Sequence, residues 1–393
     1  MEDDEPELYV ADPVYTKDHV KGYTSYTLKG SRVPEPLSRR YRDFDALRKK
    51  LVERWPGIFI PNIPHKKKVG NKGKRIIWMR VEMLNRFLKK LSKIDYLFNS
   101  EEMELFLQNS SNVSKTLDGI KLENYEDLLR KYSEAIKDYD DNFDTTAGKE
   151  DQEKFTKKLN EIYPKIKNFR NIVFHAKERY KSEQENYLAV INMISLYEKE
   201  TIKSFVNNDE NKLVFFNMKN EELCKHIQDA HEQVINPYDR LYNAITEDYL
   251  NVEAMIECIE KLKELHDAYN KLTKNFTHLN IQLNELQAGK SSVKTIFKNK
   301  EKEITKLTEE KEEMENNMNC LGQIIKITTF NMQNEIRDFK MVSLDNYYAE
   351  LSRIEGDTEK NSTIFDDIWE TVVKDKNISN RRSEERRVGK ECR

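Results

Sequence analysis

The chain has 393 residues, of which 37% are hydrophobic and 35% are charged. An average globular domain is about 45–50% apolar and about 25% charged. Two domains are expected at this length. The composition excludes one large spherical core and favours long thin helices, in which much of each helix faces water.

The net charge of −3 hides an uneven distribution along the chain. Residues 1–112 contain 22 Lys and Arg residues against 16 Asp and Glu residues, whereas the remainder contains 45 against 54. Residues 39–93 alone carry 18 basic and 4 acidic side chains. So concentrated a basic field needs an anionic partner, and a phosphoinositide membrane and a nucleic acid are the two candidates at this point.

Three features bear on location. The four cysteines follow no disulfide framework, which suggests a reducing compartment. The first ten residues are acidic and have no apolar core, so we expect no signal peptide. No apolar run approaches the roughly 18 residues of a membrane span, so we expect any membrane contact to be peripheral.

The N-terminal region is predicted to be a small α+β fold. Seven of the nine prolines precede residue 65, which indicates strands and turns there. Three short β-rich stretches up to residue 41 predict a three-stranded meander. After it the apolar period becomes helical, with a proline-rich loop over 55–64 and a final short helix over 101–108. The expected inward residues are Phe44, Leu47, Leu51 and Trp55 in one helix and Met83, Leu84, Phe87, Leu88 and Leu91 in the next.

Beyond Lys115 the apolar residues are spaced three and four apart in three successive runs. Breaks at 207–211 and 288–292 predict three long helices. Each seam buries only a stripe, so each helix needs partner helices. A generic antiparallel coiled coil and a dimerisation domain both meet this need. We expect the second helix to bury a dimer seam of Tyr249, Val252, Leu262, Leu265, Leu272 and Phe276.

Motifs for catalysis, metals and nucleic acids are weak. The Ala-Gly-Lys-Ser run at 288–291 lacks the first glycine of a phosphate loop, since Asn284 stands there. Cys224, His226 and His231 offer too few ligands for zinc, and three polar residues along a helix is the better interpretation. No catalytic Ser/His/Asp or Cys/His arrangement and no nucleic-acid module stands out. We therefore expect no enzyme, no metal, no cofactor and no nucleic-acid partner.

Three motifs in order carry a family resemblance. Arg-Arg-Tyr-Arg-Asp-Phe at 39–44, with Leu47 following, resembles the signature of the Phox-homology (PX) domain. Ile-Pro-Asn-Ile-Pro-His-Lys at 60–66 resembles its proline-rich loop, and Arg80 with Leu84 its next basic position. Val-Ala-Asp-Pro at 10–13 is similar to the first strand of the sorting-nexin subgroup. The long helices resemble the BAR domain that follows the PX domain in one sorting-nexin class.

The resemblance implies a phosphoinositide site. Arg40 would bind the 3-phosphate of phosphatidylinositol 3-phosphate, and Tyr41 would pack its ring beneath the inositol. Lys66 would contact the 1-phosphate, and Arg80 the 4- and 5-hydroxyls. A planar guanidinium meets phosphate oxygens with paired charge-assisted hydrogen bonds, which suits this chemistry. The chain departs from the family pattern at 78–79, where Trp and Met stand in place of acidic residues.

A loop beside this site concentrates positive charge without an acidic residue. Near an anionic leaflet each such charge contributes about 1 kcal/mol of binding, although the same run also fits a solvated turn. We expect it to act as a membrane-electrostatic loop. Its residues beyond Lys66 are Lys67, Lys68, Lys72, Lys74 and Arg75.

The predicted architecture is multidomain. An α+β PX domain spans 1–112, a linker with an amphipathic helix spans 113–154, and an elongated all-α, three-helix coiled-coil BAR domain spans 155–375. The basic tail over 376–393 is open to two interpretations, a disordered segment or a non-native appendage, and we assign it no function.

The resemblance implies a non-enzymatic, cytoplasmic protein that is peripheral on early endosome membranes. It would bind phosphatidylinositol 3-phosphate, form a homodimer or heterodimer through its helices, contact coat or cargo proteins, and sense or induce curvature in endosomal sorting and retrograde traffic. The alternative is a coiled-coil scaffold whose PX domain docks proteins rather than lipid.

Overall fold

The computed structural model describes residues 7–17, 22–66, 74–108, 112–140, 142–143, 145–197, 200–201, 203–205, 220–288 and 300–373. Its contacts divide the chain into two units, and we describe each by itself. The first unit comprises Met1–Lys165 and Glu247–Val342, and the second comprises Ile166–Thr246 and Ser343–Arg393.

The first unit opens with an antiparallel sheet in the order β1 (Tyr9–Lys17), β2 (Gly22–Lys29) and β3 (Leu37–Arg40), so the predicted meander is confirmed. The pairing of β1 with β2 shifts between Ala11 and Val14. Asp12 lies within this irregularity and has a φ of +42°, in the left-handed region. On β2 and β3, Ser25 lies opposite Arg40.

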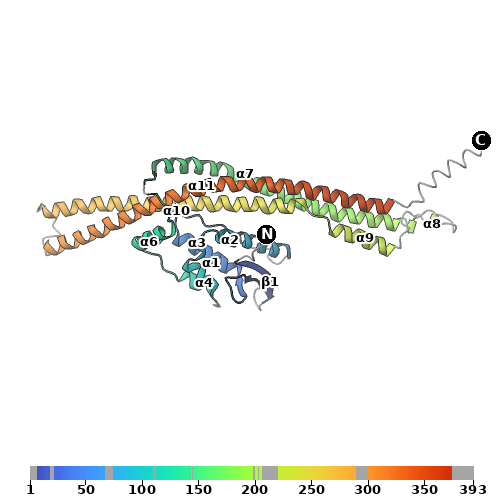
Figure 1. Cartoon of the computed structure of the whole chain (residues 1–393), viewed down its shortest axis with the longest axis horizontal. Coiled ribbons are helices and arrows are strands. Elements are labelled where there is room, and N and C mark those ends of the chain that lie inside the picture. Colours follow the sequence, from blue (N-terminus) through green and yellow to red (C-terminus); the bar gives the residue numbers. More distant parts are fainter. Residues whose placement is uncertain are drawn as a thin grey trace, which may run out of the picture. The chain divides into compact units, whose positions relative to one another are not determined.

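Six short helices follow the sheet: α1 (Tyr41–Arg54), α2 (Lys74–Leu91), α3 (Asp95–Phe98), α4 (Glu101–Leu107), α5 (Val113–Asp118) and α6 (Tyr125–Ala135). All nine inward residues predicted for α1 and α2 are at most 3% exposed, so both helical faces are confirmed. The Asn85 side chain ties α2 to β1, accepting from the Val10 amide at 2.6 Å and donating to its carbonyl at 3.0 Å. Figure 1 shows these elements gathered beside α10 within the first unit.

Three long helices are present, as predicted: α7 (Thr145–Tyr197), α10 (Pro237–Gln287) and α11 (Lys300–Val373). Two shorter helices, α8 (Lys203–Phe205) and α9 (Asn220–Glu232), lie between α7 and α10 in the sequence. The expected continuous second helix is therefore wrong, because the chain breaks at 233–236 between α9 and α10. Pro237 starts α10 where a proline is tolerated, and the Asn236 side chain accepts from the Tyr238 amide at 3.1 Å.

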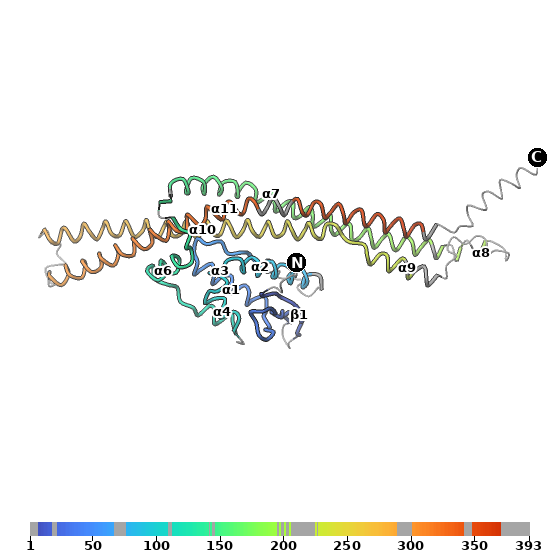
Figure 2. The backbone as a smooth tube through the Cα atoms, in the orientation of Figure 1, coloured from blue at the N-terminus to red at the C-terminus, as the bar shows by residue number. Residues whose placement is uncertain are grey.

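An asparagine of α11 stabilises this break within the second unit. Asn361 accepts a hydrogen bond from the Ile235 amide at 2.9 Å and donates one to the Ile235 carbonyl at 2.6 Å. The same side chain lies 2.8 Å from the Tyr180 hydroxyl of α7. Nearby, Ile191, Ile227, Ala230 and Ile368 form a buried cluster that joins α7, α9 and α11, and Figure 2 shows these helices side by side.

The seam assigned to a dimer on α10 needs correction. Of its six residues, Tyr249, Val252, Leu262 and Leu265 are at most 7% exposed within the single chain and cannot contact a second copy, whereas Leu272 and Phe276 are partly exposed. At the turn after α1, Gly57 has a φ of +83°, and a Cβ there would lie 3.4 Å from Thr328 and 3.5 Å from Leu262. A glycine is needed both for this backbone and for this close approach. The N-terminal region itself therefore covers this part of the seam.

Glu335 on α11 is predicted to make the first unit pH-sensitive. Burial, with a smaller effect of Asp338, raises the pKa of its carboxyl to about 7, from 4.5. The folded state then holds this proton more tightly than the unfolded state, so stability is lost as the pH rises from 4.5 to 7. Glu335→Gln should be more stable than the parent at pH 8 by at most about 3 kcal/mol.

The measurement is thermal or denaturant unfolding across pH 5–8, in which the gain from Glu335→Gln should shrink as the pH falls. Glu309→Gln, which removes an exposed carboxyl from the same helix, is the matched control. An equal gain at both ends of the pH range would contradict the prediction.

Candidate functional site

Arg40 lies at the junction of β3 and α1, where it is the N-cap of the helix. Its backbone amide donates to the Asp43 carboxylate at 2.8 Å, which fixes the first turn. Its guanidinium lies 3.4 Å from the centroid of the Tyr23 ring on β2. The strand register explains this contact, since Tyr23 is two residues from Ser25, the cross-strand partner of Arg40. The partly exposed guanidinium is thus positioned by an aromatic face.

Tyr41 connects α1 to the proline-rich loop. Its hydroxyl donates a hydrogen bond to the Pro64 carbonyl. Burial raises the pKa of Tyr41 to about 12, with a further contribution from Asp45, so the hydroxyl stays protonated at neutral pH. The loop that ends in Lys66 is therefore held against α1 by a permanent donor.

Arg80 on α2 is only 5% exposed, and its guanidinium lies 4.9 Å from the centroid of the Tyr41 ring. It also acts on Tyr26, whose pKa is raised by burial and lowered in part by the nearby Arg80 charge. Arg80 thus places a buried positive charge between two tyrosines.

Lys66 is exposed and lines, together with Tyr41, a cavity of about 600 Å³. The structure therefore brings Tyr41 together with both Arg80 and Lys66, while Arg40 lies against Tyr23. Of the predicted electrostatic loop, Lys67, Lys68 and Lys72 lie outside the described residues. Lys74 and Arg75 begin α2, and their side chains also lie outside the described part.

Acidic residues of α10 form the opposite wall of this cavity, which the sequence reasoning missed. His65 Nε2 lies 2.7 Å from Glu253, and an Arg48 nitrogen lies 2.5 Å from Glu257. The Tyr163 hydroxyl of α7 also donates to Glu253, at 2.8 Å. Arg48 and Glu257 are 209 residues apart in the chain, so no local pattern could have paired them.

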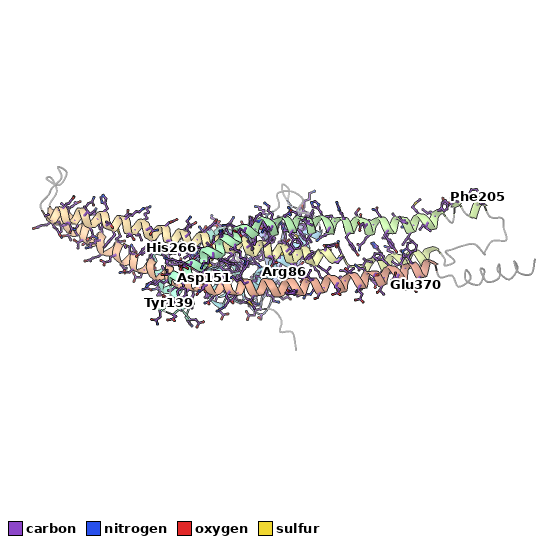
Figure 3. All side chains as sticks on the ribbon, turned by 90° about the horizontal axis from the view of Figure 1, so that it is seen from above. Arg86, Tyr139, Asp151, Phe205, His266 and Glu370 are labelled. Atoms are coloured by element: carbon purple, nitrogen blue, oxygen red, sulfur yellow. The ribbon has the colours of Figure 1, made fainter. Side chains whose placement is uncertain are left out.

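A second set of ion pairs joins α2 to α10. Arg86 and Lys90 both pair with Glu247, and Lys90 also donates to Asn251 at 2.8 Å. Figure 3 labels Arg86 within this part of the first unit. Burial alone would raise the pKa of Glu247, but Lys90 and Arg86 lower it, so the carboxylate remains charged between two cations.

Trp78 stands out at the start of α2, because 59% of its surface is exposed. Ile76 and Met79 beside it are partly exposed. An apolar group next to a strongly basic sequence is typical of contact with a membrane interface. In the sequence, Trp78 and Met79 marked only a departure from the family pattern, and the exposed surface became visible in the structure.

The described residues contain no group of three or more His, Cys, Asp or Glu side chains suited to hold a metal ion.

Within the same described ranges, every helix is too short or too polar to cross a membrane.

Comparison with known proteins adds independent observations. Residues 30–110 match the family model of the PX domain. Sorting nexin 1 of Arabidopsis thaliana is 35% identical over 108 residues, which cover 25% of this chain and 27% of that protein. Human sorting nexin-30 is 34% identical over 144 residues, covering 33% and 31%. Vacuolar protein sorting-associated protein vps5 of Schizosaccharomyces pombe is 32% identical over 110 residues, covering 26% and 19%.

These matches span less than a third of the length of the curated relatives. Among solved structures, the SNX-BAR Mvp1 tetramer gives a TM-score of 0.46 at 16% identity, covering 94% of this chain and 100% of that one. The resemblance to the PX region of sorting nexins is thus confirmed, and the chain's own coordinates supply the three long helices expected after it.

The Tyr41 hydroxyl is predicted to hold the proline-rich loop in place. Tyr41→Phe should cost about 1 kcal/mol of stability and speed amide exchange over 58–66 in hydrogen-exchange mass spectrometry. Tyr125→Phe is the control, because the Tyr125 hydroxyl makes no hydrogen bond among the described residues. Unchanged exchange in Tyr41→Phe would show that the loop is held by other contacts.

Proposed function

We propose that this chain, whose residues 30–110 form a PX domain, is a non-enzymatic peripheral membrane protein that binds phosphatidylinositol 3-phosphate. It acts on the cytoplasmic face of early endosomes in sorting and retrograde traffic, where it senses or induces curvature. The observation that carries the proposal is Arg40, a partly exposed guanidinium held over Tyr23 beside Tyr41, inside the matched region. Relatives named sorting nexins and a vacuolar protein sorting-associated protein support the trafficking role.

The chemistry of the headgroup fits these side chains. A phosphomonoester offers several acceptor oxygens, and the fork of Arg40 can donate two parallel hydrogen bonds to them. Tyr41 supplies a flat apolar face for a sugar-like ring. Arg80 adds a buried charge behind that ring, and Lys66 lies at the exposed end of the loop that Tyr41 holds. Together they would make a pocket specific for a phosphorylated inositol.

The membrane contact would extend beyond the pocket. Lys67, Lys68, Lys72, Lys74 and Arg75 would add electrostatic attraction to anionic lipid, at about 1 kcal/mol for each charge near the surface. Trp78 would enter the interface beside them, since its ring is 59% exposed. In this proposal the PX domain spans 1–112, the linker 113–154, the BAR-like domain 155–375 and the tail 376–393.

Dimerisation is proposed to use α7 instead of the seam on α10, four of whose six residues are covered within the chain. In the second unit, eight large apolar side chains described on α7 are 38–62% exposed, and six of them form a stripe. At about 100° per residue they share one face of the helix, and a stripe of this kind needs a partner. A second copy would cover both stripes at once through a twofold contact. The six residues are Phe169, Ile172, Val190, Met193, Ile194 and Tyr197.

Arg40→Ala should abolish sedimentation of the full chain with vesicles that contain phosphatidylinositol 3-phosphate, while the circular dichroism spectrum stays unchanged. The physical reason is the loss of the paired contact to the 3-phosphate, so Arg40→Lys should restore little binding. Arg42→Ala is the matched control, because it removes the same charge from an exposed neighbour whose side chain faces Asp43. Undiminished binding by Arg40→Ala would favour the alternative scaffold that docks proteins.

Val190→Asp combined with Ile194→Asp should convert the dimer to a monomer. Each new carboxylate would have to lose its hydration inside an apolar interface. Because this is costly, the two chains should stay apart. Light scattering at micromolar concentration should show the chain mass instead of twice that mass. Asn171→Asp with Asn192→Asp, two exposed positions of the same helix outside the stripe, is the control. A parent chain that is monomeric would remove the dimer from the proposal and leave the PX assignment intact.

A further inference from the structure

A second cavity, lined mainly by basic and neutral polar side chains, lies between α7 and α10 in the first unit. It measures about 630 Å³. Lys149 and Lys157 line it from α7, and Lys263 and His266 line it from α10, against one carboxylate, Glu153. Figure 3 labels His266 on α10 and Asp151 near the start of α7, where the two helices run together. Four basic groups thus converge in a domain that is otherwise acidic.

Two other lysines of the same helices are already paired with carboxylates. Lys154 pairs with Glu150 at 3.7 Å, and Lys261 pairs with Glu264 at 2.8 Å. By contrast, Lys149, Lys157 and Lys263 form no ion pair or hydrogen bond with any residue that the structure describes. The ammonium groups of these three lysines are therefore available to an external anion.

The electrostatics of His266 support the same conclusion. Burial lowers the pKa of His266, and the Lys149 ammonium lowers it further, against the opposing effect of Asp267. The field of Lys149 on α7 therefore reaches a group on α10 across the cavity. An anion placed between them would be attracted to the Lys149 ammonium and would favour the protonated form of His266.

The remaining wall indicates the kind of anion. The neutral amides of Gln152 and Asn160 stand beside the lysines, and Ile259 contributes apolar surface. The lining contains no Phe, Tyr or Trp on which a nucleobase could stack. The volume lies within the roughly 300–1,000 Å³ usual for small-molecule sites. Several phosphates on a compact polyol would meet the three separate ammonium groups better than one carboxylate would.

We propose that this α7–α10 cavity binds a clustered-phosphate anion, either a free inositol polyphosphate or the headgroup of a multiply phosphorylated lipid. Asn160 lies on the walls of both this cavity and the one lined by Tyr41 and Lys66. The two sites are therefore adjacent in the first unit. The proposal does not depend on lipid binding by Arg40, because none of its charged groups lines the cavity of Tyr41 and Lys66.

The test uses the full chain with Arg40→Ala, so that the PX pocket cannot supply the signal. Inositol hexakisphosphate is titrated by calorimetry, and vesicles with and without phosphatidylinositol 4,5-bisphosphate are used in sedimentation. Adding Lys157→Gln and Lys263→Gln should weaken binding roughly 30-fold. The control adds Lys154→Gln and Lys261→Gln, which remove equal charge from the same helices and should weaken binding less than about threefold.

If inositol hexakisphosphate binds, and the Lys157→Gln and Lys263→Gln pair removes that binding, the occupant is a soluble polyphosphate or a lipid headgroup. If only the vesicles bind, and the same pair of substitutions removes that binding, the occupant is the lipid headgroup. Replacing both lysines by Arg should retain binding. This result would show that the anion is held by the positive charge at positions 157 and 263. The proposal is overturned if the Arg40→Ala chain binds neither probe, or if the control pair weakens binding as much as the cavity pair.

Discussion

The ion pairs between the PX region and α10 are the interaction on which the site depends. Arg48, His65 and Arg86 each reach a different glutamate of α10, and Gly57 brings the backbone against Leu262 and Thr328. Without these pairs the basic N-terminal region and the acidic helices would each carry unbalanced charge. Pairing neutralises part of the excess inside the first unit and leaves other basic groups facing outwards. The uneven charge along the sequence therefore serves both internal docking and external binding.

The same contacts also position the loop beside the candidate pocket. Tyr41 holds the proline-rich loop through Pro64, and His65 ties the adjacent residue of that loop to Glu253. Lys66 is the exposed residue that directly follows these two anchored positions. The geometry of the loop is set by two elements far apart in the sequence, α1 and α10, so a change in either would be felt at the pocket.

Local patterns predicted what depends on local physics. The alternating and helical periods found the meander, the inward faces of α1 and α2, and the three long helices. They could not identify partners, because an apolar stripe fits any complementary surface. Leu262 was assigned to a second chain for this reason, although the turn at Gly57 covers it. The pairing of Arg48 with Glu257 could not be predicted either, since a charged residue does not reveal which distant residue will neutralise it.

For the candidate site, the motif identified Arg40, Tyr41, Lys66 and Arg80, and the structure supplied their supports. Tyr23 became visible only through the strand register that sets it beside Arg40. The basic cavity between α7 and α10 had no sequence signal, because its lysines resemble the many others on these helices. Only their convergence from two helices distinguishes them.

The break before α10 has a consequence for how the chain tolerates changes in length. In a continuous helix, one inserted residue rotates everything that follows by about 100° and so misaligns every later seam. Here Asn361 binds both backbone groups of Ile235, and a new helix begins at Pro237. An insertion or deletion before residue 233 would turn α9 while the phase of α10 restarts from a fixed point. The two hydrogen bonds between Asn361 and Ile235 thus keep the register of α10 independent of changes in chain length before it.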